Sequence, residues 1–128
     1  MSKLTMSSGR VALATFGLAI LTLAMGFAAN LPDISGNWLI KWDSGPPNAL
    51  FLTNTGGDLS GTYTNDAKQT CSVTGHYSAA NRDFAVHIQC SNYNVELQGS
   101  LSADGATAPG KYWFKGTMTG TFTMARAE

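Results

Sequence analysis

Two cysteines are the residues whose chemistry the sequence indicates most directly. Cys71 and Cys90 lie at equal distances from a predicted turn at residues 79–82, where Ser78 and Asp83 close a hairpin. Residues placed symmetrically about such a turn face each other across neighbouring strands, close enough for a disulfide. Closing a loop of this length contributes about 3 kcal/mol in the chain-entropy model. The sequence therefore predicts a Cys71–Cys90 disulfide, the alternative being a buried pair of free thiols.

The two histidines are the next residues that could do chemistry. His76 and His87 fall on the two strands of that same hairpin, on the outward side and in diagonal positions. Zinc sites in proteins use three or four protein ligands, and the sequence supplies no third ligand beside this pair. We therefore expect solvated surface histidines, with no metal site.

No arrangement of catalytic groups emerges from the sequence. It contains no Gly-x-Ser-x-Gly turn, and Asp43 and Asp66 fall in predicted loops. The predicted inward side of the strands carries no Asp, Glu, His, Lys or Arg, so no general acid or base points to the interior. We expect no catalytic residues and no cofactor.

A group of aromatic, amide and hydroxyl side chains is the remaining candidate site. In a chain of alternating strands, the connections after the first, third, fifth and seventh strands meet at one end. The residues predicted near that end are Trp42, Asp43, Ser44, Tyr63, Asn65, Gln69, Tyr93, Asn94 and Tyr112. Aromatic rings with a few converging polar groups are typical of small-molecule pockets.

We assign these residues distinct roles in a predicted ligand site. Trp42, Tyr63 and Tyr112 would form apolar walls, Ser44 and Asn65 would donate or accept orienting hydrogen bonds, and Tyr93 would lie beside them. The alternative is a filled interior in which the same aromatic rings act as plugs, because eight strands leave little room at the centre.

The elements that must position these residues are β-strands. A five-residue cassette (apolar, any residue, glycine, any residue, apolar) occurs six times, at residues 34–38, 59–63, 73–77, 97–101, 108–112 and 118–122. Turn-forming residues separate the segments at even intervals. They define eight strands, at residues 36–43, 49–54, 59–65, 71–78, 84–90, 95–102, 107–113 and 117–125.

Alternate residues in these strands separate into an apolar and a polar side, so each strand buries one side only. Closing eight such strands removes exposed edges, and the predicted fold is all-β, an eight-stranded antiparallel up-and-down β-barrel. Met118 falls on the predicted inward side, while Trp113, beside Phe114, is expected to face outward. The cassette glycines either allow the strands to coil or leave a cavity.

The first 29 residues are expected to be separate from this domain. Lys3 and Arg10 precede an uncharged run at residues 11–29 that ends in small residues, a pattern typical of a signal helix for secretion. An uncleaved membrane anchor is the alternative. We thus expect a signal peptide at 1–29 and one β-barrel domain at 30–128, in a secreted or periplasmic protein.

The strand segments resemble the avidin and lipocalin (calycin-type) group of small barrels. The resemblance rests on Gly36-Asn37-Trp38 and on the segments 59–63 and 73–77. It implies that Ser44 and Tyr63 lie where avidins place hydrogen-bonding groups for the ring of their ligand. Ile40 stands where an asparagine is expected, Asn65 replaces a serine, and the final strand carries no aspartate, so the resemblance does not extend to biotin binding.

These observations favour a carrier of a small hydrophobic or aromatic molecule. Six basic and eight acidic residues follow residue 29 without runs of either sign, which excludes a nucleic-acid partner. After signal cleavage we expect no membrane contact. One alternative is a protein-interaction or inhibitor module that uses the outer face and loops, Trp113 and Pro46-Pro47 among them. A further alternative is a cyclase-like barrel enzyme that only shapes its substrate.

Overall fold

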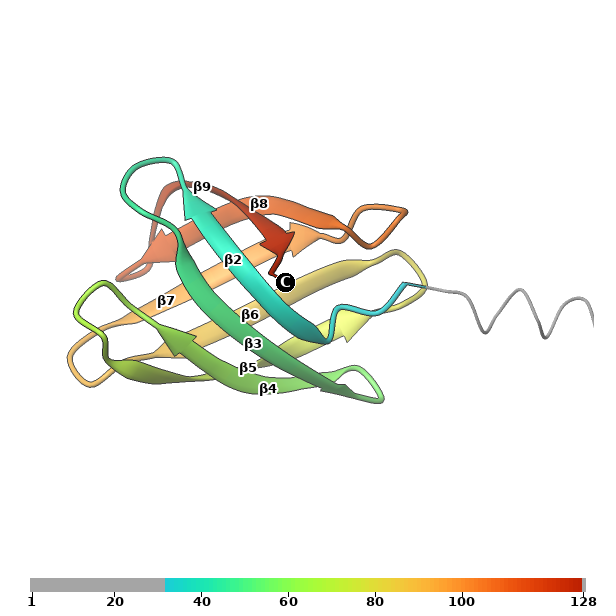
Figure 1. Cartoon of the computed structure of the whole chain (residues 1–128), viewed down its shortest axis with the longest axis horizontal. Coiled ribbons are helices and arrows are strands. Elements are labelled where there is room, and N and C mark those ends of the chain that lie inside the picture. The colour runs from blue at the N-terminus through green and yellow to red at the C-terminus, as the bar shows by residue number, and fades with distance from the viewer. Residues whose placement is uncertain (1–31, 128) are drawn as a thin grey trace, which may run out of the picture. The chain divides into compact units, whose positions relative to one another are not determined.

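The computed structural model describes residues 32–127, which form a closed antiparallel barrel of eight strands in up-and-down order (Figure 1). The predicted signal helix lies outside the described residues. Residues 32–127 contain no helix long and apolar enough to cross a membrane. The strands are β2 (Gly36–Trp42), β3 (Asn48–Thr55), β4 (Asp58–Thr64), β5 (Thr70–Ser78), β6 (Asp83–Gln89), β7 (Asn94–Ser100), β8 (Thr107–Phe114) and β9 (Thr117–Arg126).

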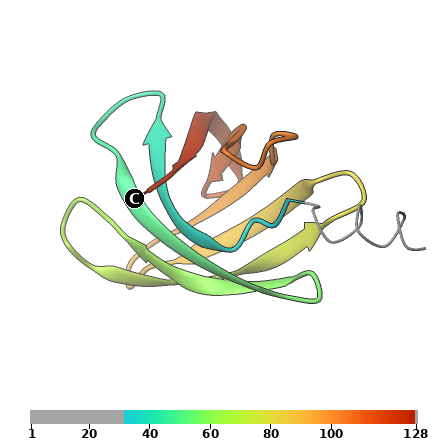
Figure 2. The ribbon, with the colours of Figure 1, turned by 45° about the vertical axis from the view of Figure 1, so that its right-hand side comes forward.

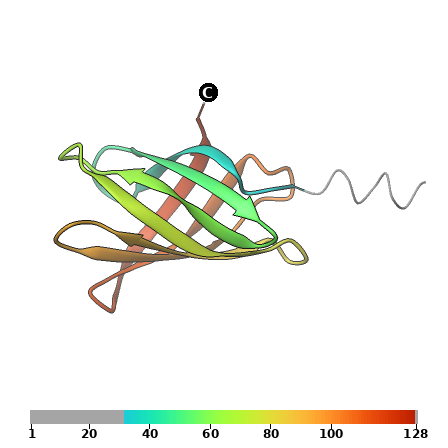
Figure 3. The same ribbon diagram turned by 90° about the horizontal axis from the view of Figure 1, so that it is seen from below.

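Each strand end lies within two residues of its predicted position. The agreement follows from the alternation of apolar and polar residues, because one buried face fixes the register of a strand. β2 pairs with both β3 and β9, which closes the ring. Figure 3 shows the strands of the near wall crossing those of the far wall, as strand tilt in a small barrel requires.

The cassette glycines permit the close approach of neighbouring strands. A Cβ atom at Gly61 would lie 1.8 Å from the backbone oxygen of Phe51, and one at Gly75 would lie 2.2 Å from that of Ala85. No side chain fits at such distances, so these positions require glycine. The strands bend strongly around the barrel axis in Figure 2, which supports the role of these glycines in coiling.

Large apolar side chains fill the middle of the barrel. They come from all eight strands, and several are fully buried, among them Trp38, Ile40, Leu50, Leu52, Val73, Val86, Ile88, Leu97 and Met124. The central layers are therefore a packed core, and any space for a ligand must lie nearer an end.

The disulfide prediction is confirmed. Cys71 and Cys90 are joined with a Cα–Cα distance of 4.5 Å, and β5 and β6 pair in the register that the symmetric hairpin predicted, from Ser72–Gln89 to Ser78–Asp83. This disulfide is consistent with an oxidising compartment.

The inward assignment of Met118 is wrong, because a β-bulge changes the alternation in β9. The register shifts at Tyr112 and Trp113, so that Tyr112 pairs with Gly120 but Trp113 pairs with Met118. Met118 consequently lies 51% exposed on the outside. Trp113 is half-buried, while Phe114 packs against the core and against Tyr93, at a ring-centroid distance of 5.9 Å.

The two ends of the barrel differ, and we name them by their connections. The closed end comprises the turns at 56–57 and 79–82, the connection at 101–106 and the segment 32–35 that precedes β2. The open end comprises the connections at 43–47, 65–69, 90–93 and 115–116. The loops of the open end extend on the left of Figure 1.

A side chain from outside the strands fills the closed end. Ile34, in the segment before β2, is 0% exposed, and its carbonyl oxygen accepts a hydrogen bond from the indole Nε1 of Trp38 at 2.8 Å. The phenol of Tyr77 donates to the carbonyl of Pro32 at 3.2 Å. The segment is thus anchored by both packing and hydrogen bonds.

Arg126 corrects the expectation that no basic group lies on the inward side. Its guanidinium carbon lies 4.0 Å from the centroid of the Trp38 ring. The same guanidinium donates hydrogen bonds to the carbonyls of Asp33, Ser35 and Gly105. The predicted strand ended at residue 125, one residue short of the arginine that covers the closed end.

Candidate functional site

A hollow of about 380 Å³ lies at the open end, between the connections 43–47, 65–69 and 90–93. Of the six predicted ligand-site residues, five line it: Trp42, Ser44, Tyr63, Asn65 and Tyr93. The sixth, Tyr112, lies beside it, with its ring centroid 4.8 Å from that of Trp42. The topology therefore brings together the side chains that the up-and-down order predicts at one end.

Asn48 organises the inner wall of the hollow, and the sequence reading missed it. Its Oδ1 accepts hydrogen bonds from the indole Nε1 of Trp42 at 2.8 Å and from the phenol of Tyr63 at 3.1 Å. Its Nδ2 donates to Oδ1 of Asp66 at 2.8 Å. Asn48 is the first residue of β3 and follows the turn residues Gly45-Pro46-Pro47. Its position at the end of this turn was the one feature of the sequence that could have placed it at the open end.

Asn65 is 8% exposed, and its polar atoms hold its own loop. Its Nδ2 donates both to Oε1 of Gln69 at 2.8 Å and to the hydroxyl of Tyr93 at 3.0 Å. Its Oδ1 accepts from the backbone nitrogen of Gln69 at 2.9 Å. Both amide hydrogens are thus engaged within the protein, and Asn65 positions Tyr93 at the edge of the hollow.

Tyr112 and Asp43 extend the polar rim behind Trp42. The phenol of Tyr112 donates to Oδ1 of Asp43 at 3.3 Å, and the other carboxylate oxygen accepts from the backbone nitrogen of Thr121 at 3.2 Å. A Cβ atom at Gly120 would lie 2.0 Å from this carboxylate, so glycine makes room for it. The cassette glycine of β9 therefore has a local role at the open end.

Burial raises the pKa of two phenols at this end, those of Tyr63 and Tyr112. Burial raises the pKa of Tyr63 to about 12, and the nearby Tyr93 and Asp66 add to this effect. Burial also raises the pKa of Tyr112, together with the charge of Asp43 and the hydrogen bond to it. Both hydroxyl groups consequently act as donors throughout the neutral range.

The other predicted residues of this end lie around the rim. Ser44 is exposed in the 43–47 connection, and Gln69 donates from Nε2 to the hydroxyl of Ser91 at 3.2 Å. Asn94 begins β7, where it is exposed and pairs with Gln89, and it does not line the hollow.

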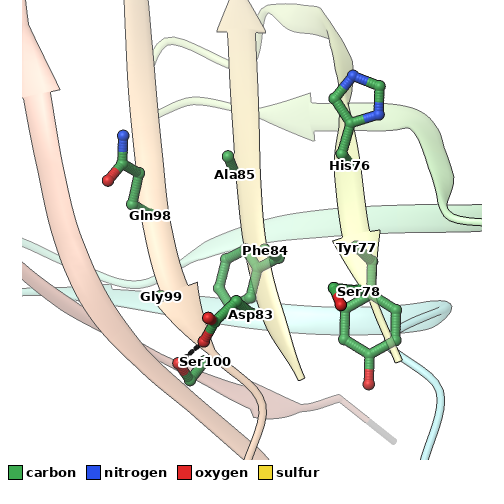
Figure 4. A pocket seen from close by; sticks show the side chains of 9 residues that line it. All are labelled: His76, Tyr77, Ser78, Asp83, Phe84, Ala85, Gln98, Gly99 and Ser100. Carbon is green, nitrogen blue, oxygen red and sulfur yellow. Dashed lines mark hydrogen bonds between the residues drawn. The ribbon is translucent and has the colours of Figure 1, made fainter. Parts of the chain in front are cut away.

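A second hollow, of about 490 Å³, lies on the outer face of β5, β6 and β7 (Figure 4). His76, Ala85 and Gln98 come from these three strands, and the hydroxyl of Ser100 donates to the carboxylate of Asp83. Its polar side chains are exposed and do not converge on a common point in Figure 4. We therefore regard the hollow at the open end as the candidate site.

Both histidines lie on the outer face, as the strand alternation predicts. His76 is paired with Asp58, at 3.2 Å from Nδ1 to Oδ1, and His87 is paired with Glu96. Across residues 32–127, no three His, Cys, Asp or Glu side chains gather closely enough to hold a metal ion.

No protein-family model and no curated protein sequence matches this chain. The closed eight-stranded antiparallel barrel is compatible with a calycin-like fold.

Proposed function

We propose that this protein is an exported carrier that binds a small, mainly apolar or aromatic molecule in the hollow at its open end. The observation that supports this most is the convergence of Trp42, Tyr63 and Tyr93 on one hollow whose amide groups hold the rings in place. Flat rings with a few fixed polar groups are the usual lining of small-molecule pockets.

The likeness to avidin and lipocalin barrels supports the proposal at the level of architecture. The interior of an eight-stranded barrel is either filled by side chains or holds one small ligand. Here the central layers are packed, so a ligand would rest at the open end, against the partly exposed ring of Trp42. The disulfide and the apolar run at residues 11–29 both agree with export.

The test is a screen of the mature domain against small aromatic and apolar molecules by native mass spectrometry and thermal shift. Ala67 lines the hollow from an exposed turn, so Ala67→Trp would fill the space without touching the core. Ala79→Trp, in an exposed turn of the closed end, is the matched control. We expect ligands that bind the wild type and Ala79→Trp but not Ala67→Trp.

Two outcomes would count against this proposal: the absence of any bound molecule, or binding that Ala67→Trp leaves unchanged. Recovery of a chemically altered molecule from the same screen would instead favour the cyclase-like alternative over a carrier.

A protein-interaction module remains a second candidate, favoured by a different surface. Leu39 on β2 and Phe51 on β3 are 42% and 44% exposed on the outer face, and Ala49, the partner of Leu39 in the ladder, lies two residues before Phe51. Contiguous apolar surface on a protein exterior marks interaction sites. A purified exported partner that binds the wild type but not the Leu39→Ser, Phe51→Ser variant would support this candidate.

A further inference from the structure

The lining of the open-end hollow carries a negative charge. Among the described residues that line it, Asp66 is the only charged one, and its carboxylate is exposed to the hollow's mouth. Asn48 donates to Oδ1 of Asp66 and so fixes the carboxylate against the inner wall. The second carboxylate oxygen, Oδ2, does not take part in this hydrogen bond.

The aromatic groups of the hollow have their polar edges engaged. Trp42 and Tyr63 both direct their hydrogen-bond donors to Asn48. Tyr63 is only 5% exposed, so a ligand meets chiefly the partly exposed ring of Trp42. An aromatic ring attracts an ammonium group placed over its face, and the attraction grows as water is excluded. A carboxylate beside such rings is complementary to an organic cation.

The nearby lysines do not line the hollow. Lys68 lines an adjoining outer depression, which shares Asn48, Asn65 and Asp66 with the hollow, and it forms no ion pair with Asp66. The ammonium of Lys115 lies 5.5 Å from the ring centroid of Phe114. The protein therefore already places one ammonium group on an aromatic ring at this end.

A second carboxylate adds to the negative character of the same end. Asp43 accepts the hydrogen bond from Tyr112, whose ring packs edge-on against Trp42. Asp43 does not line the hollow, but its charge adds to that of Asp66 at the same end of the barrel.

We infer that the ligand class of this hollow is an organic ammonium ion with an aromatic or alkyl body. This inference rests on the proposed carrier function and specifies its ligand. The ammonium group would pair with Asp66, and the apolar body would lie against the partly exposed rings of Trp42 and Tyr93.

The test compares three probes of similar size and shape: 2-phenylethylamine as the cation, 3-phenylpropanol as the neutral molecule and 3-phenylpropionate as the anion. Binding is measured by calorimetry and by amide chemical-shift changes in the connections of the open end. We expect the cation to bind about tenfold more tightly than the neutral probe, and the preference to shrink as salt is added.

Asp66→Asn is the informative variant, because its side-chain oxygen can still accept the hydrogen bond from Asn48. We expect it to abolish the preference for the cation while leaving the affinity for the neutral probe unchanged. Asp58→Asn, which removes an exposed carboxylate from the outer face of β4, is the control and should keep the preference.

The outcomes separate this inference from the carrier proposal. Equal binding of the three probes, a preference for the anion, or a cation preference that survives Asp66→Asn would overturn the inference and leave the carrier proposal standing. Failure of all three probes to shift any amide of the open end would count against both.

Discussion

The two ends of this barrel are built from the same strands but stabilised differently. At the closed end, Ile34 fills the opening, and Arg126 ties the segment before β2 to the connection at 101–106. At the open end, a disulfide and a network of amides fix the loops around a hollow. The comparison shows how a small barrel can keep a hollow at one end, because packing at the other end supplies stability.

The largest effect should come from removing the plug of the closed end. Ile34→Ala deletes a fully buried side chain, and we expect a loss of about 2–5 kcal/mol in the free energy of unfolding, measured with urea. Leu39→Ala, which truncates a 42% exposed side chain on the outer face of β2, is the control and should cost about 0.5 kcal/mol or less. Equal losses of unfolding free energy in the two variants would mean that packing of Ile34 does not stabilise the closed end.

The disulfide should have the next largest effect, and it should act on the open end. Cys71, the second residue of β5, pairs with Tyr63, and the backbone nitrogen of Cys90 donates to the carbonyl of Tyr93 at 2.9 Å. Replacing both cysteines with alanine removes a crosslink with a sequence separation of 19 residues, and we expect a loss of about 3 kcal/mol.

Amide hydrogen exchange would locate this effect. In the double alanine variant, exchange should quicken in the connections at 65–69 and 90–93 more than in the turn at 79–82. The wild type treated with a reducing agent is the control and should give the same pattern. If amide exchange quickened equally at both ends, the disulfide would stabilise the whole barrel and not the open end in particular.

The sequence predicted the strands and the disulfide because both depend on local patterns. Alternation fixes which side of a strand is buried, and the symmetric hairpin at 79–82 fixes the pairing of Cys71 with Cys90. The orientation of Met118 could not be predicted in this way, because a single bulge reverses the alternation of inward and outward residues without altering the composition of the strand.

The roles of Asn48 at the open end and Arg126 at the closed end could not be predicted, because they depend on contacts between segments that are distant in the sequence. Asn48 donates a hydrogen bond to Asp66, 18 residues further along the chain. Arg126 donates to the carbonyls of Asp33, Ser35 and Gly105, all of which are at least 21 residues away in the sequence. Up-and-down order could predict which loops meet, but it could not predict which amide would accept the indole hydrogen of Trp42.

A smaller effect is expected from Arg126, the second component of the closed end. Arg126→Lys keeps the charge but loses the planar group that reaches three backbone carbonyls and covers Trp38. We expect a loss of about 1–3 kcal/mol, because three backbone carbonyls, two of them in part-buried hydrogen bonds, lose a charged donor. Lys111→Arg, an exposed change on the outer face of β8, is the control, measured in the same urea titration. If Arg126→Lys cost no more unfolding free energy than the control, Arg126 would not stabilise the closed end, and the stabilisation would rest on Ile34.

The smallest effect should be a pH dependence confined to the closed end. Partial burial raises the pKa of Asp33, but the hydrogen bonds from Asn54 and Ser35 outweigh it and hold the pKa below the ordinary value of 3.8. A carboxyl group with a lowered pKa stabilises the folded state above its unfolded pKa, and this stabilisation is lost as the pH falls through the folded pKa. Because Asp33 is exposed, we expect less than about 1 kcal/mol.

Asp33→Asn would isolate this contribution, since it removes the charge but keeps a side chain of the same shape. The free energies of unfolding of the wild type and of the variant should differ at about pH 6 and converge once the pH has fallen below the lowered pKa of folded Asp33. Amide exchange at Ser35 should follow the same course, while the connections of the open end stay unchanged. If amide exchange in the connections of the open end also quickened as the pH fell, the two ends would unfold as one cooperative unit. The ends would then differ in the residues that stabilise them but not in local stability.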